Sequence, residues 1–428
     1  MKDYSIKAAS AMIILSGAIA SGAEPTTSEI ITEMAETISE SYVFPDVGEQ
    51  VSEMLLGNLK SGEYDELAGR ELADTLEDQI RNLTHDLHFG VRSLPPNWTP
   101  PTEGEDAGLR QGPSAPYGFN SVERLGGNIG YIDLRGFNNA NSIGETVDAV
   151  MRLVQGSSSI IFDLRRNGGG DPDAVALISS YLFEPSKSIH LNSLYSRPRD
   201  ETTEYWTHAD IDTTLAMPDT PVYVLTSRQT FSAAEEFTYN LKNLERATII
   251  GETTGGGAHP VDQILFSNDE TDRHYLMILP TARAINPISG TNWEGTGVAP
   301  DFEVSADDAL NVAIGQILQT LADEGDEGAL WELVAHNAYN NPHVLSKSEL
   351  GEYAGQYTDR ELMLDNGELM YRRIGNPNWS RLIAAEKDIF VIDGFDGFQM
   401  HFERDSSGAI EQITGHYQQG RVDYSIRE

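Results

Sequence analysis

Apolar residues recur at helical spacing along the first part of the chain. Ile31, Met34 and Ile38 lie three or four positions apart, and the same spacing continues to about Leu83. Residues at this spacing share one face of an α-helix, which they bury against a neighbouring element. The pattern predicts a small helical bundle over residues 24–95.

Between residues 126 and 304 the pattern changes to short β-branched runs that alternate with helical ones. Ile129–Leu134 and Val222–Thr226 have the length of strands, whereas Ala233–Leu244 has helical spacing. Alternation of this kind is typical of α/β layer structures with crossover connections. Because a further helical pattern follows this stretch, we expect an α/β core with trailing helices over residues 126–345.

Two other segments have distinct patterns. Residues 96–125 are rich in proline, glycine and charge over most of their length, which predicts a surface loop or linker. Residues 346–428 carry short runs of aromatic and β-branched residues between turn signals such as Ser407-Gly408. We expect a separate small β domain there.

The N-terminus has the layout of an export signal. Lys2 and Lys7 precede an apolar run that ends in small residues at Ala23. This layout predicts a signal peptide over residues 1–23, cleaved near Ala23, and therefore a periplasmic or extracellular protein. No later segment reaches roughly 18 consecutive apolar residues, so we expect no membrane insertion.

Composition narrows the classes of partner. The 428-residue chain has 29 Lys and Arg against 67 Asp and Glu, a net charge of -38. Such a charge repels phosphate backbones and anionic lipids, so nucleic-acid binding is not expected. The absence of cysteine excludes disulfides and thiolate metal sites. Composition does not determine the oligomeric state.

The strongest local motif runs from Thr226 to Phe237 and predicts a strand, a tight turn and a helix that starts at Ser232. A serine at a helix N-terminus lies beside unpaired N–H groups, where the helix dipole favours developing negative charge, as a nucleophile requires. Ser232 and Glu235 also fit a capping box, which stabilises a helix start by about 1 kcal/mol without any catalytic role. The segment alone leaves both interpretations open.

A second motif, Asn167-Gly168-Gly169-Gly170-Asp171, predicts a glycine-rich turn between a strand and a helix. Glycines let backbone amides approach a ligand closely, so this turn could donate to an oxyanion or could be purely structural. A phosphate site is disfavoured because no lysine follows the glycines and Asp171 places negative charge there. We therefore expect no nucleotide cofactor.

A serine nucleophile needs a general base. His85 and His88 flank Asp86, and His259 follows a run of glycines. The two closely spaced histidines lack a third ligand, so we predict no metal. Glu294, in a dense turn, could orient an imidazole as the third member of a catalytic relay, or could simply be solvated.

Taken in order, these motifs resemble those of the tail-specific, or C-terminal processing, serine peptidases. The sequence is most similar to the branch related to interphotoreceptor retinoid-binding protein and the tricorn protease core. This resemblance implies a core of the crotonase and Clp-protease type, a layered spiral of ββα units. The matching segments are Asp86-Leu87-His88, Asp163–Gly169, Thr230–Glu235, Gly251-Glu252-Thr253 and Trp293–Asp301.

The resemblance also implies roles for the matching residues. Ser232 would be the nucleophile, His88 the general base and Glu294 its supporting acid. The backbone N–H of Ala233 and that of Gly168 or Gly169 would form the oxyanion hole. The implied reaction is hydrolysis of a peptide or protein substrate through an acyl-enzyme, with no cofactor and no metal.

The sequence departs from the bacterial tail-specific branch in two places. Residues 251–257 lack the lysine that serves as base in that branch, so a histidine must replace it. The interval between His88 and Ile129 is too short for a PDZ domain, so a preference for C-terminal tails does not follow from the resemblance.

Two further resemblances bear on function. The segment from Leu350 onward resembles the small lipocalin-like β domain that is often attached to exported bacterial hydrolases. Retinoid-binding relatives keep the core fold while holding apolar ligands. A non-catalytic periplasmic binding protein for an apolar ligand is therefore the alternative to a peptidase.

Overall fold

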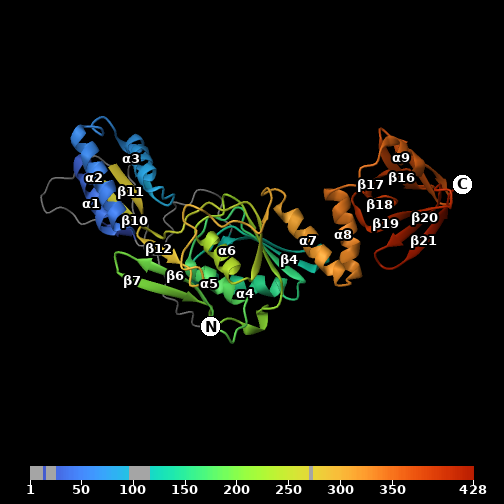
Figure 1. The fold of residues 1–428 in the computed structure, drawn as a ribbon, viewed down its shortest axis with the longest axis horizontal. Helices are drawn as coiled ribbons and strands as arrows, with labels where there is room; N and C mark the ends of the chain where they lie inside the picture. Colours follow the sequence, from blue (N-terminus) through green and yellow to red (C-terminus); the bar gives the residue numbers. More distant parts are fainter. Residues whose placement is uncertain (1–12, 16–25, 96–115, 269–272) are drawn as a thin grey trace. The chain divides into compact units, whose positions relative to one another are not determined.

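The computed structural model describes residues 13–15, 26–95, 116–268 and 273–428 (Figure 1). Its contacts divide the chain into two compact units, residues 1–124 with 130–309 and residues 125–129 with 310–428. The predicted signal peptide lies outside the described residues apart from Ile13–Leu15, which form the short strand β1.

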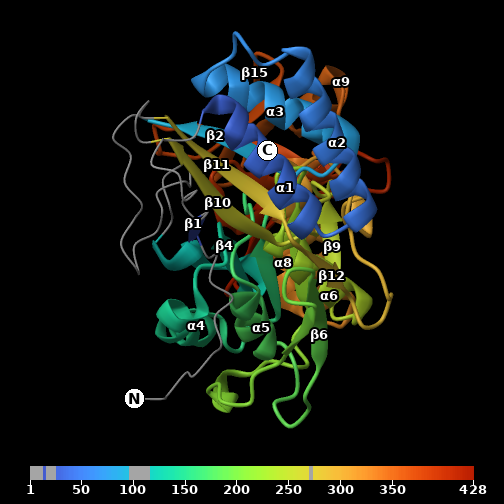
Figure 2. The same cartoon turned by 90° about the vertical axis from the view of Figure 1, so that its left-hand side faces the viewer.

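The first unit contains three helices where the apolar spacing predicts helical segments. Thr26 and Glu29 form a capping box at the start of the first helix, and Pro45 begins the second. Their buried apolar residues form one core cluster with residues of a four-stranded sheet. Figure 2 shows the three helices beside this sheet. The helices are α1 (Thr27–Ser41), α2 (Pro45–Ser61) and α3 (Gly69–Thr84), and the strand order is β1, β10 (Val261–Asn268), β11 (Arg273–Pro280) and β2 (Gly90–Leu94).

The local pattern did not reveal this sheet. Ile278 of β11 pairs with Gly90 of β2, so strands far along the chain complete the helical block. Pairing between such distant segments depends on tertiary folding, which helical periodicity cannot indicate. The sheet matters for the site because β2 begins two residues after His88.

The centre of the first unit is a six-stranded sheet with helices packed against it. Strand β13 at one edge and the neighbouring strands β9, β8 and β5 pair in parallel. All five residues of β5 are buried, as expected for a parallel strand covered on both faces. The order is β13 (Phe302–Glu303), β9 (Ala247–Gly251), β8 (Val222–Thr226), β5 (Ser159–Asp163), β4 (Ile129–Leu134) and β3 (Phe119–Leu125), with helices α4 (Ala140–Val154), α5 (Pro172–Ser180) and α6 (Ala233–Asn243).

The parallel pairing of β5 with β8 positions the glycine-rich turn and the turn that contains Ser232. The glycine-rich turn follows the carboxyl end of β5, and the Ser232 turn follows the carboxyl end of β8. Neighbouring parallel strands end at the same edge of a sheet, where ligand sites of α/β proteins commonly form. Phe231 N–H donates to Asn167 O at 3.0 Å, which joins the two turns directly.

A small antiparallel sheet lies beside this core in the first unit. Its order is β12 (Ala282–Ile285), β6 (His190–Ser196) and β7 (Glu201–Trp206).

Of the linker predicted over residues 96–125, the first part lies outside the described residues. The remainder forms the short helix η1 (Pro116–Gly118) and β3, and the short helices η2 (Gly126–Asn128) and η3 (Thr213–Leu215) follow later.

The second unit is an eight-stranded antiparallel sheet with three helices. The end strands approach each other through a bridge between Tyr357 and Arg427, which nearly closes a barrel. Aromatic side chains such as Phe390 and Phe402 form its core. Its elements are α7 (Ala309–Asp323), α8 (Glu327–Asn340), α9 (Lys347–Tyr353), β14 (Gly355–Tyr357), β15 (Arg360–Asp365), β16 (Glu368–Arg373), β17 (Ser380–Glu386), β18 (Ile389–Ile392), β19 (Phe395–Arg404), β20 (Ile410–Tyr417) and β21 (Val422–Ile426).

The fold is therefore mixed α/β. The sequence places the start of the last domain at residue 346, whereas the contacts group α8 and nearly all of α7 with the barrel. No helix in the described part of the chain is long and apolar enough to cross a bilayer.

Candidate active site

Ser232 occupies a sharp turn between β8 and α6. Its backbone has φ 55° and ψ -124°, a conformation that residues other than glycine rarely adopt. Strain of this kind costs about 1–3 kcal/mol and persists only where surrounding contacts hold it. The side chain of Ser232 lines a pocket of about 310 Å³.

Glu235 holds this turn in place. One carboxylate oxygen accepts the N–H of Ser232 at 2.9 Å and that of Gly257 at 2.9 Å. The other accepts the Thr254 hydroxyl at 2.6 Å and the N–H of Gly256 at 2.6 Å. Burial raises the pKa of Glu235, and these hydrogen bonds to the carboxylate oppose that rise. Glu235 therefore does more than cap α6, because it ties the serine turn to the loop at residues 254–257.

The glycine-rich turn packs against Ser232. Gly169 has φ +106°, and a Cβ atom there would lie 2.7 Å from Cβ of Ser232 and 2.9 Å from N of Ala233. Only glycine fits such a close approach with this backbone. The N–H of Gly169 donates to Asn167 Oδ1 at 2.9 Å. Among the described residues, the N–H groups of Gly168 and Ala233 have no such acceptor, and Gly168 lines the pocket.

His88 lines the same pocket as Ser232. Its ring packs against Phe231, with 4.6 Å between the ring centroids. Both ring nitrogens are buried, and neither has a hydrogen-bond partner among the residues that the structure describes. Burial lowers the pKa of His88 to about 4; His259 and Arg81 act in the same direction, and Asp86 opposes them. The imidazole is therefore neutral at neutral pH and has a lone pair available.

Contacts to the backbone hold the segment that carries His88. Oδ1 of Asp86 accepts the N–H of His88 at 3.0 Å. Arg81 donates to the carbonyl of Leu87 at 3.1 Å and to that of Phe89 at 2.7 Å. Because these contacts fix the residues on both sides of His88, the position of its ring depends on α3 and on Asp86.

Glu294 lies against a second histidine. Its Oε2 atom is 3.4 Å from Nδ1 of His259 and accepts the N–H of Ala258 at 2.6 Å. Nδ1 of His259 is 2.7 Å from Oδ2 of Asp86, which also accepts the Tyr42 hydroxyl at 3.2 Å. Burial raises the pKa of Glu294 to about 7. Glu294 therefore lies within ion-pair distance of His259, and no hydrogen bond among the described residues joins it to His88.

The structure thus brings some predicted residues together and separates others. Ser232, His88 and Gly168 line one pocket, while Glu294 belongs to a neighbouring buried cluster with His259 and Asp86. His85, considered as a base, is the exposed residue that ends α3. Sequence reasoning did not identify Arg81 or assign a role to Asp86. The position of Asp86 two residues before His88 was the available signal.

The buried cluster is also the candidate for a metal centre. Ligand atoms of Asp86, His259 and Glu294 lie within 4.8 Å of one another, and no other such group occurs in the described ranges. The separation of 2.7 Å between His259 and Asp86 is that of a charge-assisted hydrogen bond, in which donor and acceptor satisfy each other. We therefore treat the cluster as a hydrogen-bonded network.

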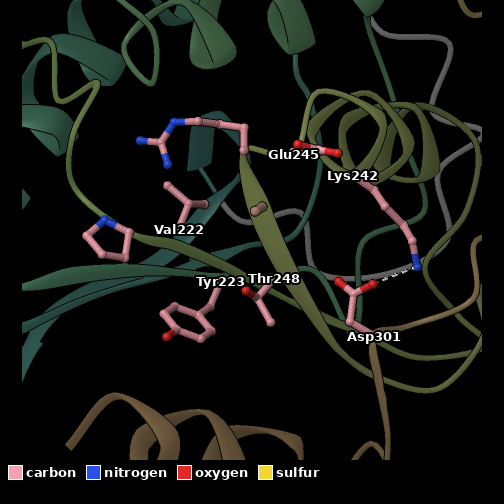
Figure 3. Close-up of a pocket in the computed structure, with 9 residues that line it drawn as sticks. Val222, Tyr223, Lys242, Glu245, Thr248 and Asp301 are labelled. Atoms are coloured by element: carbon pink, nitrogen blue, oxygen red, sulfur yellow. Dashed lines mark ion pairs between the residues drawn. The ribbon is translucent and has the colours of Figure 1, made fainter. Parts of the chain in front are cut away.

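A larger pocket, of about 430 Å³, lies elsewhere in the first unit (Figure 3). Lys242 and Asp301 form an ion pair of 2.9 Å on its wall, and Tyr223 and Thr248 line it as well. None of the predicted catalytic residues lines this pocket. The smaller pocket, which contains Ser232 and His88, is therefore the candidate active site.

Family comparisons agree with the motif order. Residues 128–304 match the family described as peptidase family S41. Residues 23–123 match the N-terminal domain of peptidase S41 in eukaryotic IRBP. The chain therefore belongs to peptidase family S41, which confirms the predicted resemblance to serine peptidases.

Individual relatives match over limited lengths. A carboxyl-terminal-processing protease of Synechocystis sp. is 37% identical over 134 residues, 31% of this chain and 29% of that protein. A tail-specific protease of Haemophilus influenzae is 25% identical over 269 residues, 59% of this chain and 36% of that protein. The chain thus spans about a third of the length of these curated relatives. The solved photosystem II D1 C-terminal processing protease has a TM-score of 0.43 and 18% identity, over 66% of this chain and 94% of that one.

Proposed function

We propose that this chain is an exported serine peptidase that hydrolyses peptide bonds through an acyl-enzyme. The observation that supports this proposal is that Ser232, His88 and Gly168 line one pocket although they lie far apart in the chain. The strained turn at Ser232 adds support, because strain of this kind is concentrated at functional sites.

In the proposed mechanism, the neutral ring of His88 accepts the proton of the Ser232 hydroxyl as Oγ attacks the substrate carbonyl. Negative charge develops on the carbonyl oxygen, and the N–H groups of Ala233 and Gly168 stabilise it. Since the N–H of Gly169 is already donated to Asn167, Gly168 is the better second donor. His88 then gives its proton to the leaving amine. Water, activated by the same ring, hydrolyses the acyl-enzyme and regenerates the serine.

Glu294 acts on this base indirectly in our proposal. It contacts His259, which is hydrogen-bonded to Asp86, and Asp86 accepts the N–H of His88. The negative charge of this cluster favours the imidazolium that forms when His88 takes a proton. Glu294, His259 and Asp86 are therefore positioning residues.

We extend the proposal to the remaining parts of the chain. Residues 1–23 are removed on export, residues 24–95 with 126–309 form the peptidase part with a core of the crotonase and Clp-protease type, and residues 346–428 form a lipocalin-like domain. The helices between them, predicted from the sequence as the trailing part of the core, belong to the unit of the barrel by their contacts. The base is a histidine, so the enzyme has no Ser–Lys dyad. The substrate is a peptide or protein, and no PDZ domain selects it.

A fluorophosphonate probe tests the proposal, because it labels an activated serine covalently. We expect labelling of the mature protein and cleavage of casein, both abolished in Ser232→Ala and both retained in Ser186→Ala, which removes an exposed serine. A folded wild-type protein that is neither labelled nor active would overturn the peptidase. Saturable binding of an apolar ligand by such a protein would favour the carrier instead.

A further inference from the structure

Arg92 lines the pocket that contains Ser232 and His88. It lies on β2, two residues after Gly90, so the two residues are on the same face of the strand. A Cβ atom at Gly90 would lie 3.3 Å from Cδ1 of Ile278 and 3.5 Å from Oε2 of Glu77. Because Gly90 has no side chain, none stands between His88 and Arg92 on this face of the strand.

The other charged residues of this pocket neutralise each other. Nη1 of Arg81 is 2.5 Å from Oε1 of Glu77, and Oε2 of Glu77 accepts the N–H of Val91 at 3.0 Å. The remaining donors of Arg81 hold the backbone beside His88. The charged groups of Glu77 and Arg81 are thus already paired within the protein.

Arg92 differs from this pair. Its side chain is exposed, and it forms no ion pair or hydrogen bond within the described ranges. Since Glu77 and Arg81 cancel and His88 is neutral, Arg92 gives the pocket one uncompensated positive charge. The chain as a whole has a net charge of -38.

We propose that Arg92 binds a carboxylate of the substrate close to the bond that is cleaved. The inference rests on the proposed peptidase function and specifies its substrate class. A guanidinium presents two parallel N–H donors that match the two oxygens of a carboxylate. The net negative charge of the protein repels anions at long range, so an anionic substrate needs a local cation of this kind, whereas a basic one does not. The carboxylate is an Asp or Glu side chain or the C-terminus of the peptide.

Two pairs of peptides test the proposal and distinguish the two sources. In one pair, amidated at the C-terminus, Asp or Glu near the cleavage site is compared with Asn or Gln. In the other, a neutral peptide has a free or an amidated C-terminus. We expect wild type to cleave the carboxylate member of at least one pair with a kcat/KM roughly 10- to 100-fold higher, the range for a hydrogen bond to a charged group. The pair that shows the difference identifies the source.

In Arg92→Gln the ratio within that pair should fall to about 1, and in Arg92→Glu it should fall below 1. The ratio cancels any general effect of the substitution on turnover. Arg70→Gln is the matched control, because Arg70 is an exposed arginine of α3, paired with Asp74 at 3.4 Å, and the ratio should stay at the wild-type value. An unchanged ratio in Arg92→Gln, or no preference in wild type, would overturn the carboxylate site while probe labelling still supports the peptidase. If the probe does not label the wild-type protein, that result would instead contradict the proposed function.

Discussion

Nδ1 of His259 lies 2.7 Å from Oδ2 of Asp86, while Oδ1 of the same carboxylate accepts the backbone N–H of His88 at 3.0 Å. One buried side chain thus connects His259 with the backbone of His88. Its ionisation affects both the stability of the first unit and the position of the proposed base.

Asp86→Asn should destabilise the protein by about 1–3 kcal/mol, the cost of disrupting hydrogen bonds to a buried group. Burial alone would raise the pKa of Asp86, but the hydrogen bond and charge of His259 together with His88 lower it overall. A lowered pKa gives stability above the ordinary value of 3.8 that is lost as the pH falls further. The difference from wild type should therefore shrink below about pH 4.

Urea unfolding measured at pH 7 and pH 3 tests this expectation. Asp78→Asn removes an exposed carboxylate of α3 and should change the free energy of unfolding by less than about 0.5 kcal/mol. Equal stability of Asp86→Asn and wild type at pH 7 would refute the role given to Asp86.

Glu294 should determine the acidic limb of the pH–activity profile. Burial raises its pKa to about 7, with Asp86 adding to the rise and His259 opposing it. The pKa of His88 is near 4, so its ring is already neutral in this range. We expect kcat/KM to increase as the pH rises through about 7, because Glu294 gains the negative charge that supports the base.

Glu294→Gln should lose this limb and reduce kcat/KM by roughly 100-fold, a typical value for impaired acid–base catalysis. Peptide cleavage measured from pH 5 to pH 9 shows the effect. Glu303→Gln, at an exposed residue of β13, should keep the limb. If Glu294→Gln keeps it as well, the group that titrates is a different one.

The two neighbouring glycines should respond differently to alanine. Gly169→Ala introduces a Cβ atom 2.7 Å from that of Ser232 at a backbone φ of +106°. We expect a loss of stability of at least about 1–3 kcal/mol and little or no labelling by the fluorophosphonate probe. At Gly168 a Cβ atom would meet nothing within 4 Å, so Gly168→Ala should fold with nearly wild-type stability. Thermal unfolding of both variants measures the contrast, and equal stability would argue against the close approach.

Glu236→Gln should stabilise the protein at alkaline pH. Burial raises the pKa of Glu236 to about 8, with a contribution from the charges of Asp171 and Asp173. Since the folded state holds this proton more tightly than the unfolded chain, wild-type stability falls as the pH rises from about 4.5 to about 8. Glutamine has no proton to lose, so the gain should reach about 2 kcal/mol or more at pH 9 and be small at pH 5.

Denaturant titrations at pH 5 and pH 9 measure this difference. Glu245→Gln makes the same change in charge at an exposed residue just after α6 and should give nearly equal effects at both values. A loss of stability in Glu236→Gln at pH 9 would mean that folding does not raise the pKa of Glu236, and would contradict this expectation.

The sequence predicted the core well where local patterns suffice. The strands Ile129–Leu134 and Val222–Thr226 have the expected bounds, and the helix expected at Ala233–Leu244 ends one residue earlier. It did not predict the sheet that joins β2 to β10 and β11, because such pairing depends on contacts between distant segments. It likewise placed the last domain boundary after α8, since helical periodicity does not show which unit a helix packs against.

The candidate site was predictable to a similar degree. Ser232, His88 and Gly168 were recognised from their motifs, and the structure brings them to one pocket. The link from Glu294 through His259 to Asp86 could not be predicted, because it joins residues from separate loops. Arg92 belongs to no recognisable motif, so the sequence could not identify it as a pocket residue. Only the position of β2 shows that it lines the pocket.

The backbone of Ser232 suits glycine better than serine. A laboratory selection for heat resistance alone would tend to recover glycine at this position and so remove the hydroxyl. Attempts to raise the thermal stability of this protein should therefore measure its activity as well as its resistance to heat.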